Sequence, residues 1–208
     1  MRNKVRIIGG EWRSRLISFS PQQDLRPTPD RVRETLFNWL GQDLTGKICL
    51  DLFAGSGALG FEAASRGAKR VVMVERDAAT FRTLEAARAQ LSAAAVELKR
   101  EDALEFMRGD RDHYDVIFLD PPFKAGVWPR LLPLLPPHMS PGAFVYCESA
   151  ARLELPAGWE AWRQGRAGQV TFQLLKRTEN EQQSGVPGDV RSDDARPRRP
   201  GAARGQDI

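Results

Sequence analysis

The sequence contains few of the residues that bind metals or cross-link chains: two cysteines and two histidines among 208 residues. Cys49 and Cys147 lie inside strand-like apolar segments, KICLDLF and AFVYCES. This placement favours buried free thiols in a reducing compartment over a disulfide. His113 and His138 have no cysteine or carboxylate at metal-ligand spacing, so we expect no metal site.

Long apolar runs are also missing. No segment approaches the roughly 20 consecutive apolar residues that a membrane-spanning helix needs. The first residues, MRNKVRIIGGEWR, carry charges but lack the apolar core of a secretory signal. We therefore expect a cytoplasmic protein, and a monomer, because no feature of the sequence requires a second copy.

Positive charge is concentrated near the N-terminus, although the net charge is only +4. Residues 1–33 contain three acidic side chains, Glu11, Asp24 and Asp30, against a larger basic set. The basic residues are Arg2, Lys4, Arg6, Arg13, Arg15, Arg26, Arg31 and Arg33. Such a segment is typical of proteins that bind polyanions. A solvated surface that is merely rich in arginine gives the same pattern, so charge alone leaves both interpretations open.

The distribution of apolar residues divides the chain into three regions. Residues 1–46 predict an N-terminal extension, made of a small β-hairpin or arm and a helix. Residues 47–178 predict an α/β domain, because near-continuous apolar strands alternate with helices such as 58–66 and 78–91; this is typical of a mainly parallel sheet covered on both faces. Segments near 160–164 and 169–175 are expected to close the sheet as an antiparallel pair. Residues 179–208 have almost no large apolar side chains and predict a disordered tail.

The helix of the extension is predicted to begin with Thr28 as the N-cap and Pro29 at the first helical position. Its apolar residues form one stripe, and Gly41 is expected to end it. Arg31 and Arg33 lie largely off this stripe, which predicts positions at the surface.

A glycine-rich turn, DLFAGSGALG, follows the first strand of the domain and opens a helix. Gly55 and Gly57 permit a tight turn and a close approach of backbone N–H groups to a ligand. Glu75 ends the next strand, where a carboxylate can accept hydrogen bonds from both hydroxyls of a ribose. The glycines also fit the G-x-G-x-x-G pattern of dinucleotide-binding proteins, and a glycine turn without a ligand stays open as well.

Asp51, four residues before Gly55, would repel a pyrophosphate but suits a ligand with a cationic amino group. The arrangement resembles the S-adenosylmethionine site of class I methyltransferases. This resemblance implies that Asp51 and the glycine loop hold the methionine part, that Glu75 binds the ribose, and that Asp102 meets the adenine amino group. Asp102 could equally be the N-cap of the next helix. The predicted cofactor-binding set is Asp51, Phe53, Ala54, Gly55, Ser56, Gly57, Glu75, Arg76, Asp102 and Ala103.

The tetrad Asp120-Pro121-Pro122-Phe123 directly follows the strand DVIFLD. In an α/β sheet it therefore faces the same crevice as the glycine loop. The lone pair of an aryl amine is delocalised, so the Asp120 carboxylate and a carbonyl of the proline turn could hold both N–H hydrogens and aim the lone pair at a methyl donor. The prolines fix these acceptors in advance, and Phe123 offers a face for a stacked base.

This tetrad matches the [DN]-P-P-[FYW] signature of methyltransferases that act on amino nitrogens. The signature is specific for the reaction but not for the substrate. The proposed role requires no raised pKa at Asp120. The alternative interpretation is a proline turn that merely ends a buried strand.

Five segments together resemble the RsmD family over about residues 4–178: RIIGGEWRSRLI, LRPTPDRVRETLFNWL, DLFAGSGALGFEAASRGA, DPPF and AGQVTFQLLKR. The resemblance implies a Rossmann-like class I fold and methyl transfer from S-adenosylmethionine to the exocyclic N2 of guanine 966 in 16S ribosomal RNA, within the assembling 30S subunit. A flipped guanine would have to enter the pocket of the tetrad. The predicted RNA-binding residues are Arg6, Arg13, Arg15, Arg26, Arg31 and Arg33, which could contact phosphates.

Four alternative functions explain part of the same pattern. An adenine-N6 DNA methyltransferase should carry a larger target-recognition region. A glutamine-N5 protein methyltransferase usually has asparagine where Asp120 stands. A nicotinamide oxidoreductase would explain the glycines but not the tetrad. A catalytically silent RNA-binding assembly factor would not need Asp120, so that Asp120→Ala would leave every cellular phenotype unchanged.

Overall fold

A seven-stranded β-sheet forms the centre of the computed structural model, which describes residues 3–19, 27–122 and 126–178. The strands lie in the order β5-β4-β3-β6-β7-β9-β8. The parallel strands are β3 (Ile48–Asp51), β4 (Arg70–Val74), β5 (Val96–Lys99), β6 (Tyr114–Leu119) and β7 (Met139–Ser149). β9 (Val170–Arg177) pairs antiparallel with β7, and β8 (Trp159–Ala167) with β9. The predicted α/β class, with its closing antiparallel pair, is confirmed.

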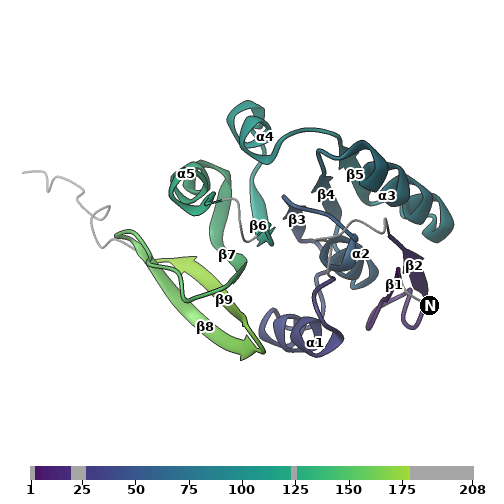
Figure 1. Ribbon diagram of the computed structural model, residues 1–208, viewed down its shortest axis with the longest axis horizontal. Coiled ribbons are helices and arrows are strands. Elements are labelled where there is room, and N and C mark those ends of the chain that lie inside the picture. The colour runs from purple at the N-terminus through teal and green to yellow at the C-terminus, as the bar shows by residue number, and fades with distance from the viewer. Residues whose placement is uncertain (1–2, 20–26, 123–125, 179–208) are drawn as a thin grey trace, which may run out of the picture. The chain divides into compact units, whose positions relative to one another are not determined.

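Helices cover both faces of this sheet (Figure 1). One face carries α1 (Asp30–Trp39), α2 (Ala58–Ser65) and α3 (Ala78–Leu91). The other carries α4 (Ala103–Gly109), α5 (Trp128–Leu131) and the 3₁₀ turns η2 (Leu132–Leu134) and η3 (Pro136–His138). The helices predicted at 58–66 and 78–91 therefore correspond to α2 and α3.

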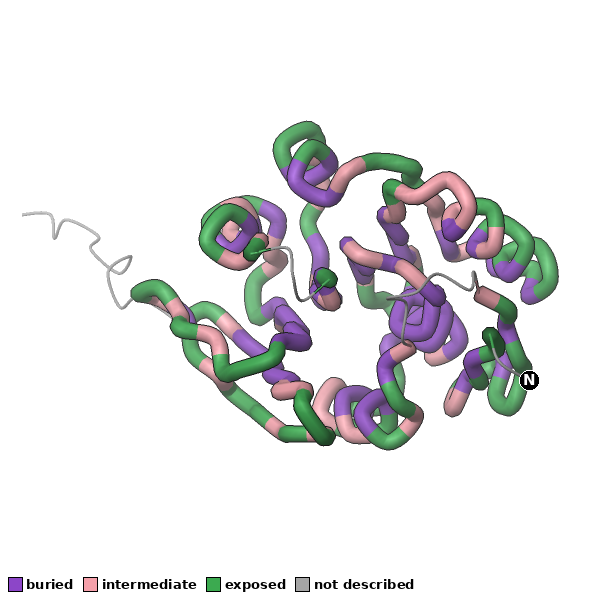
Figure 2. Tube along the Cα trace, viewed as in Figure 1, coloured by how far each residue is buried: buried purple, intermediate pink, exposed green. Residues whose placement is uncertain are grey.

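The buried core runs through the middle strands, which are buried on both faces (Figure 2). Cys49, Val71 and Phe118 point to the side of α1–α3, whereas Leu50 and Val72 point to the side of α4 and α5. This double burial is why the strands read as continuous apolar runs rather than alternating ones. Both cysteines are buried free thiols, as predicted, and burial raises the pKa of Cys49 to about 12.

The N-terminal extension shares this core. Strands β1 (Lys4–Arg6) and β2 (Leu16–Ser18) form an antiparallel hairpin, which is one of the two forms, hairpin or arm, that the sequence left open. Val5, Ile7, Trp12 and Ile17 are buried in the same apolar cluster as the inner side chains of α1 and α2. Residues 1–178 accordingly form one compact unit, so the extension is a layer of the domain rather than a separate lobe.

The start of α1 differs from the prediction. Pro29, not Thr28, is the N-cap residue, and no side chain caps the helix. The Thr28 hydroxyl instead donates a 2.6 Å hydrogen bond to Glu148, at the end of β7. The predicted N-cap role of Thr28 is therefore wrong, because a buried carboxylate elsewhere in the fold takes its hydroxyl. Gly41, with a φ of +94°, follows the helix end as predicted.

Within the described ranges, no helix has the length and apolar character to cross a membrane.

Candidate active site

The order of the strands creates a crevice between β3 and β6. From β3 the chain continues outward to β4 and β5, and it then returns to place β6 on the other side of β3. Ligands of open α/β sheets bind beyond the carboxyl ends of the strands at such a switch point. Asp51 is the last residue of β3, and Asp120 directly follows β6. The sheet thus brings together the two acids that the sequence singled out.

The glycine loop lies between β3 and α2 and has backbone angles that favour glycine. The φ angles are +49° at Gly55 and +79° at Gly57, the N-cap of α2. A Cβ atom at Gly57 would lie 2.6 Å from Phe61 Cδ2 and 2.9 Å from Leu84 Cδ2. The loop therefore packs tightly against α2 and α3, and a side chain larger than that of glycine would clash at position 57.

Asp51 lies beneath this loop and is 1% exposed. Its Oδ2 accepts a 2.9 Å hydrogen bond from the N–H of Gly60 in the first turns of α2. Its Oδ1 is buried and, among the described residues, has no hydrogen-bond partner; the Phe53 amide favours the ionised carboxylate without reaching normal hydrogen-bond geometry. Burial first, and then the charge of Glu75, raise the pKa of Asp51 to about 7. An unpaired buried acceptor of this kind fits a ligand that carries a cationic amino group.

Glu75, half-buried after β4, is tied to the same loop. Its Oε2 accepts from the N–H of Gly55 at 3.0 Å, and its Oε1 accepts from the N–H of Asp77 at 2.8 Å. The predicted ribose-binding carboxylate therefore lies directly at the glycine turn. Of the other predicted loop positions, Ala54 and Ser56 are buried and Phe53 is half-buried.

Asp102 is the N-cap of α4. Its Oδ1 accepts from the N–H groups of Leu104 at 2.9 Å and Glu105 at 3.4 Å, which confirms the capping interpretation. Its Oδ2 lies 3.8 Å from Nη1 of Arg76, an exposed residue that follows Glu75. Ala103, the first residue of the helix, is buried. Asp102 thus lies one strand further along the same edge of the sheet, after β5, and Arg76 lies beside Glu75 after β4.

The tetrad begins where β6 ends. Asp120 is half-buried, Pro121 is buried and Pro122 is exposed. Phe123 lies outside the described residues. Burial raises the pKa of Asp120 well above its ordinary value, and the negative charges of Glu148 and Asp51 raise it further. The predicted role of Asp120 does not require a raised pKa, but its position in the fold, beside two other acids, raises it.

Glu148 is a site residue that the sequence interpretation missed. Leu119 of β6 pairs with Cys147 of β7, so the residues that follow them, Asp120 and Glu148, lie side by side at the end of the sheet. Glu148 is 5% exposed, and its Oε1 accepts from Thr28 Oγ1 at 2.6 Å and from the Tyr146 hydroxyl at 2.9 Å. Burial raises its pKa. The only available signal was an acid at the end of the apolar strand AFVYCES.

No group of three potential metal ligands lies together in the described part of the chain.

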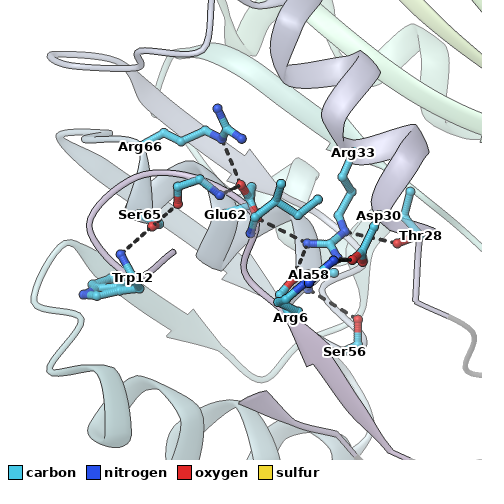
Figure 3. Close-up of polar contacts among 12 residues, drawn as sticks. Arg6, Trp12, Thr28, Asp30, Arg33, Ser56, Ala58, Glu62, Ser65 and Arg66 are labelled. Atoms are coloured by element: carbon cyan, nitrogen blue, oxygen red, sulfur yellow. Dashed lines mark hydrogen bonds and ion pairs between the residues drawn. The ribbon is translucent and has the colours of Figure 1, made fainter. Parts of the chain in front are cut away.

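Arg33 does not fit its predicted role. It is 0% exposed, and its guanidinium lies 2.6 Å from Asp30 and 3.2 Å from Glu62 (Figure 3). It also donates to the carbonyl oxygens of Thr28 at 3.1 Å and Arg6 at 2.9 Å. The predicted phosphate contact of Arg33 is therefore wrong: the side chain is an internal link between α1, α2 and the hairpin.

The other predicted arginines differ from Arg33 in exposure. Arg6, Arg13, Arg15 and Arg31 are exposed on the hairpin, its loop and the outer side of α1. Arg6 also forms an ion pair with Asp30 at 2.8 Å. Arg26 lies outside the described residues. Arg13, Arg15 and Arg31 thus present exposed positive charges, whereas the charge of Arg6 is shared with Asp30.

Comparisons with known proteins agree with this architecture. Residues 5–176 match the family model described as "Conserved hypothetical protein 95". "Ribosomal RNA small subunit methyltransferase D" of Escherichia coli K12 is 40% identical over 84% of this chain and 90% of its own length. Its namesake from Haemophilus influenzae is 38% identical over 84% of this chain and 95% of its own length.

Solved structures give the same result. One of them is the structure of yhhF from Escherichia coli, which is named as a methyltransferase candidate. It superimposes on this chain with a TM-score of 0.77 at 39% sequence identity and covers 85% of this chain and 99% of its own. A ribosomal protein L11 methylase from Lactobacillus delbrueckii shares the fold at 20% identity, with a TM-score of 0.58 over 70% of this chain and 79% of that one.

The sheet order, the glycine loop after β3 and the tetrad after β6 define a Rossmann-like class I methyltransferase fold. The sequence similarity covers nearly the whole described chain and identifies the family within this class. This protein belongs to the RsmD family.

Proposed function

We propose that this protein transfers a methyl group from S-adenosylmethionine to the exocyclic N2 of a guanine in 16S ribosomal RNA, guanine 966 by family resemblance. The observation that carries the proposal is the juxtaposition of Asp120, the first residue of the proline tetrad, with the glycine loop across the β3–β6 switch point. The names of its relatives, ribosomal RNA small subunit methyltransferases, support the class of substrate.

Asp51, Glu75 and the Gly55–Gly57 backbone are the groups proposed to hold the cofactor. The unpaired Oδ1 of buried Asp51 suits the methionine ammonium group. Glu75, held at the loop by two backbone N–H groups, suits the ribose hydroxyls. Asp102 and the neighbouring Arg76 and Ala103 would border the adenine. When bound, the cofactor supplies an electrophilic methyl group on a sulfonium.

Asp120 and the proline turn are proposed to prepare the acceptor nitrogen. The carboxylate would accept one N2–H, and a carbonyl of the turn the other, so that the lone pair points out of the base plane. Methylation makes the nitrogen acidic. The raised pKa of Asp120 makes it a suitable acceptor for the proton that then leaves, and water is the alternative acceptor. Phe123 would stack on the base.

Exposed arginines of the hairpin and α1 are proposed to bind RNA phosphates. These are Arg6, Arg13, Arg15 and Arg31. Arg26, which lies outside the described residues, is proposed to join them. The assembling 30S subunit would be the partner, and the enzyme would act as a cytoplasmic monomer. Because phosphate contacts position rather than select, the choice of base falls to the site itself.

A labelled-methyl assay with three substrates tests the proposal: partly assembled small subunits from unmethylated cells, naked 16S RNA and duplex DNA, with nucleoside analysis of the products. N2-methylguanosine from the ribosomal substrates alone is the expected result. N6-methyladenine in the DNA, or no product in any of the three, would overturn it.

A further inference from the structure

Guanine differs from adenine and cytosine, the other bases with an exocyclic amino group, in the ring nitrogen next to that group. In guanine the ring nitrogen N1 carries a hydrogen, so the edge presents two donors, N1–H and N2–H, side by side. The ring nitrogens next to the amino groups of adenine and cytosine are acceptors instead. A site that places two carboxylates side by side therefore matches guanine and repels the other two bases.

The active site contains such a second carboxylate. Glu148 is the penultimate residue of β7 and Asp120 directly follows the neighbouring strand β6, and the pairing of Leu119 with Cys147 sets the two acids next to each other. Side chains of register partners in parallel strands lie on the same face, so both acids follow the face that carries Phe118 and Tyr146. Asp120 and Glu148 also influence each other's ionisation, as near neighbours do.

The hydrogen bonds of Glu148 leave one oxygen for a substrate. Thr28 Oγ1 and the Tyr146 hydroxyl both donate to Oε1, at 2.6 and 2.9 Å. No described residue donates to Oε2. Two donors on one oxygen fix the orientation of a carboxylate that is 5% exposed. Such double anchoring is the arrangement expected of a group that reads a base edge rather than of a carboxylate on the surface.

We propose that Glu148 selects guanine, accepting the N1–H through Oε2 while Asp120 accepts an N2–H. This proposal rests on the proposed guanine-N2 methylation and adds the residue that reads the base. Thr28 and Tyr146 are positioning residues that act through Glu148. Thr28 thereby contributes to the choice of substrate, because its hydroxyl donates a hydrogen bond to Glu148.

A pair of substrates and one conservative variant test this role. The reference substrate is a small-subunit particle with guanosine at the target position; the second carries 2-aminopurine there, which keeps the 2-amino group but has an N1 acceptor. Wild-type enzyme should prefer guanosine by about 100-fold or more in kcat/KM, the scale of leaving a buried acceptor unmatched. Glu148→Gln keeps an oxygen for Thr28 and Tyr146 and turns an NH₂ group toward N1.

The decisive quantity is the ratio of kcat/KM for the two substrates. The two amino groups differ in intrinsic reactivity, but this difference affects wild type and variant alike and cancels when their ratios are compared. Glu148→Gln should lower this ratio by about 100-fold, losing guanosine activity and gaining activity on 2-aminopurine. Tyr146→Phe, which removes one anchor but keeps the carboxylate, should lower the rate on guanosine and preserve the preference. An unchanged ratio in Glu148→Gln would overturn the proposal, whether or not the rates fall.

Two controls separate this proposal from the proposed function. Binding of S-adenosylhomocysteine and the thermal midpoint of each variant report on the cofactor site and on folding. If wild-type enzyme does not methylate the guanosine particle at all, the proposed function fails. If wild-type enzyme does methylate it, and Glu148→Gln lowers kcat/KM equally on both substrates, only the selective role of Glu148 fails.

Discussion

Replacing Arg33 with methionine tests whether a buried ion network holds the N-terminal extension on the sheet. The guanidinium of Arg33 lies 2.6 Å from Asp30 and 3.2 Å from Glu62, and it donates to two backbone carbonyl oxygens. Methionine retains much of the apolar stem but none of the donors. The change leaves Glu62, which is 0% exposed, with one ionic partner fewer.

The size of the loss in folding stability depends on the hydrogen bonds and the ion pair that Glu62 retains. Removing one partner of a buried ion pair costs about 3–5 kcal/mol. Glu62 still accepts from Arg66 at 2.9 Å and from the N–H groups of Ile8 and Gly9 at 2.8 Å each. We therefore expect the lower end, about 3 kcal/mol. In a folded unit of this size, each kcal/mol lowers the thermal midpoint by roughly 2–4 °C, so the expected decrease is about 6–12 °C.

Thermal and urea denaturation measure this loss, with Arg31→Met as the matched control. Arg31 is exposed on the same helix, so its replacement should change the stability by less than about 0.5 kcal/mol. The double variant Arg33→Met with Glu62→Gln should recover part of the loss, because no buried carboxylate then lacks its partner. A loss below about 1 kcal/mol in Arg33→Met would refute the reasoning.

Four further predictions concern the site. Asp120→Ala should lower kcat/KM by about 1000-fold while the dissociation constant of S-adenosylhomocysteine stays unchanged; near-normal turnover would contradict the role of Asp120. Replacing Arg13 and Arg15 with glutamine should weaken RNA binding and reduce the slope of log K against log salt by about 1.5, whereas an unchanged slope would exclude both as phosphate contacts. Because the pKa of Asp51 is raised to about 7, its carboxyl is mostly protonated at pH 6 and ionised at pH 8, so cofactor affinity measured by calorimetry should rise across this range, and Asp51→Asn should abolish the rise. The same raised pKa makes the ligand-free protein less stable as the pH rises from about 4 to 7, because the folded state keeps a proton that the unfolded chain releases.

The sheet and the position of the site could be predicted from the sequence because their signals are local. Strands buried on both faces are continuous apolar runs, and glycine turns and proline tetrads are contiguous motifs. Helix α3 occupies the predicted residues, Ala78–Leu91, because Asp77 caps it and accepts from the N–H of Thr80. The ends of β3 and β6 meet through a general property of parallel sheets.

The errors arose where a side chain is used by a distant part of the chain. Thr28 has every local property of an N-cap, yet its hydroxyl is used by a carboxylate of β7. Arg33 lies off the apolar stripe of α1, yet Glu62 of α2 supplies the partner that allows a charge to be buried there. Glu148 could not be assigned at all, because only the pairing of β6 with β7 sets it beside Asp120.

The hydrogen bond between Thr28 and Glu148 has a consequence for the order in which the protein matures. Its two residues are 120 positions apart, and they meet only after β7 has been made. At translation rates of roughly 5–20 residues per second, Thr28 is synthesised about 6–24 s before its partner exists. Contacts of such separation also form late in folding, because their loop must first be closed. The hydrogen bond between Gly55 and Glu75, which spans 20 residues, can therefore form well before Glu148 is anchored.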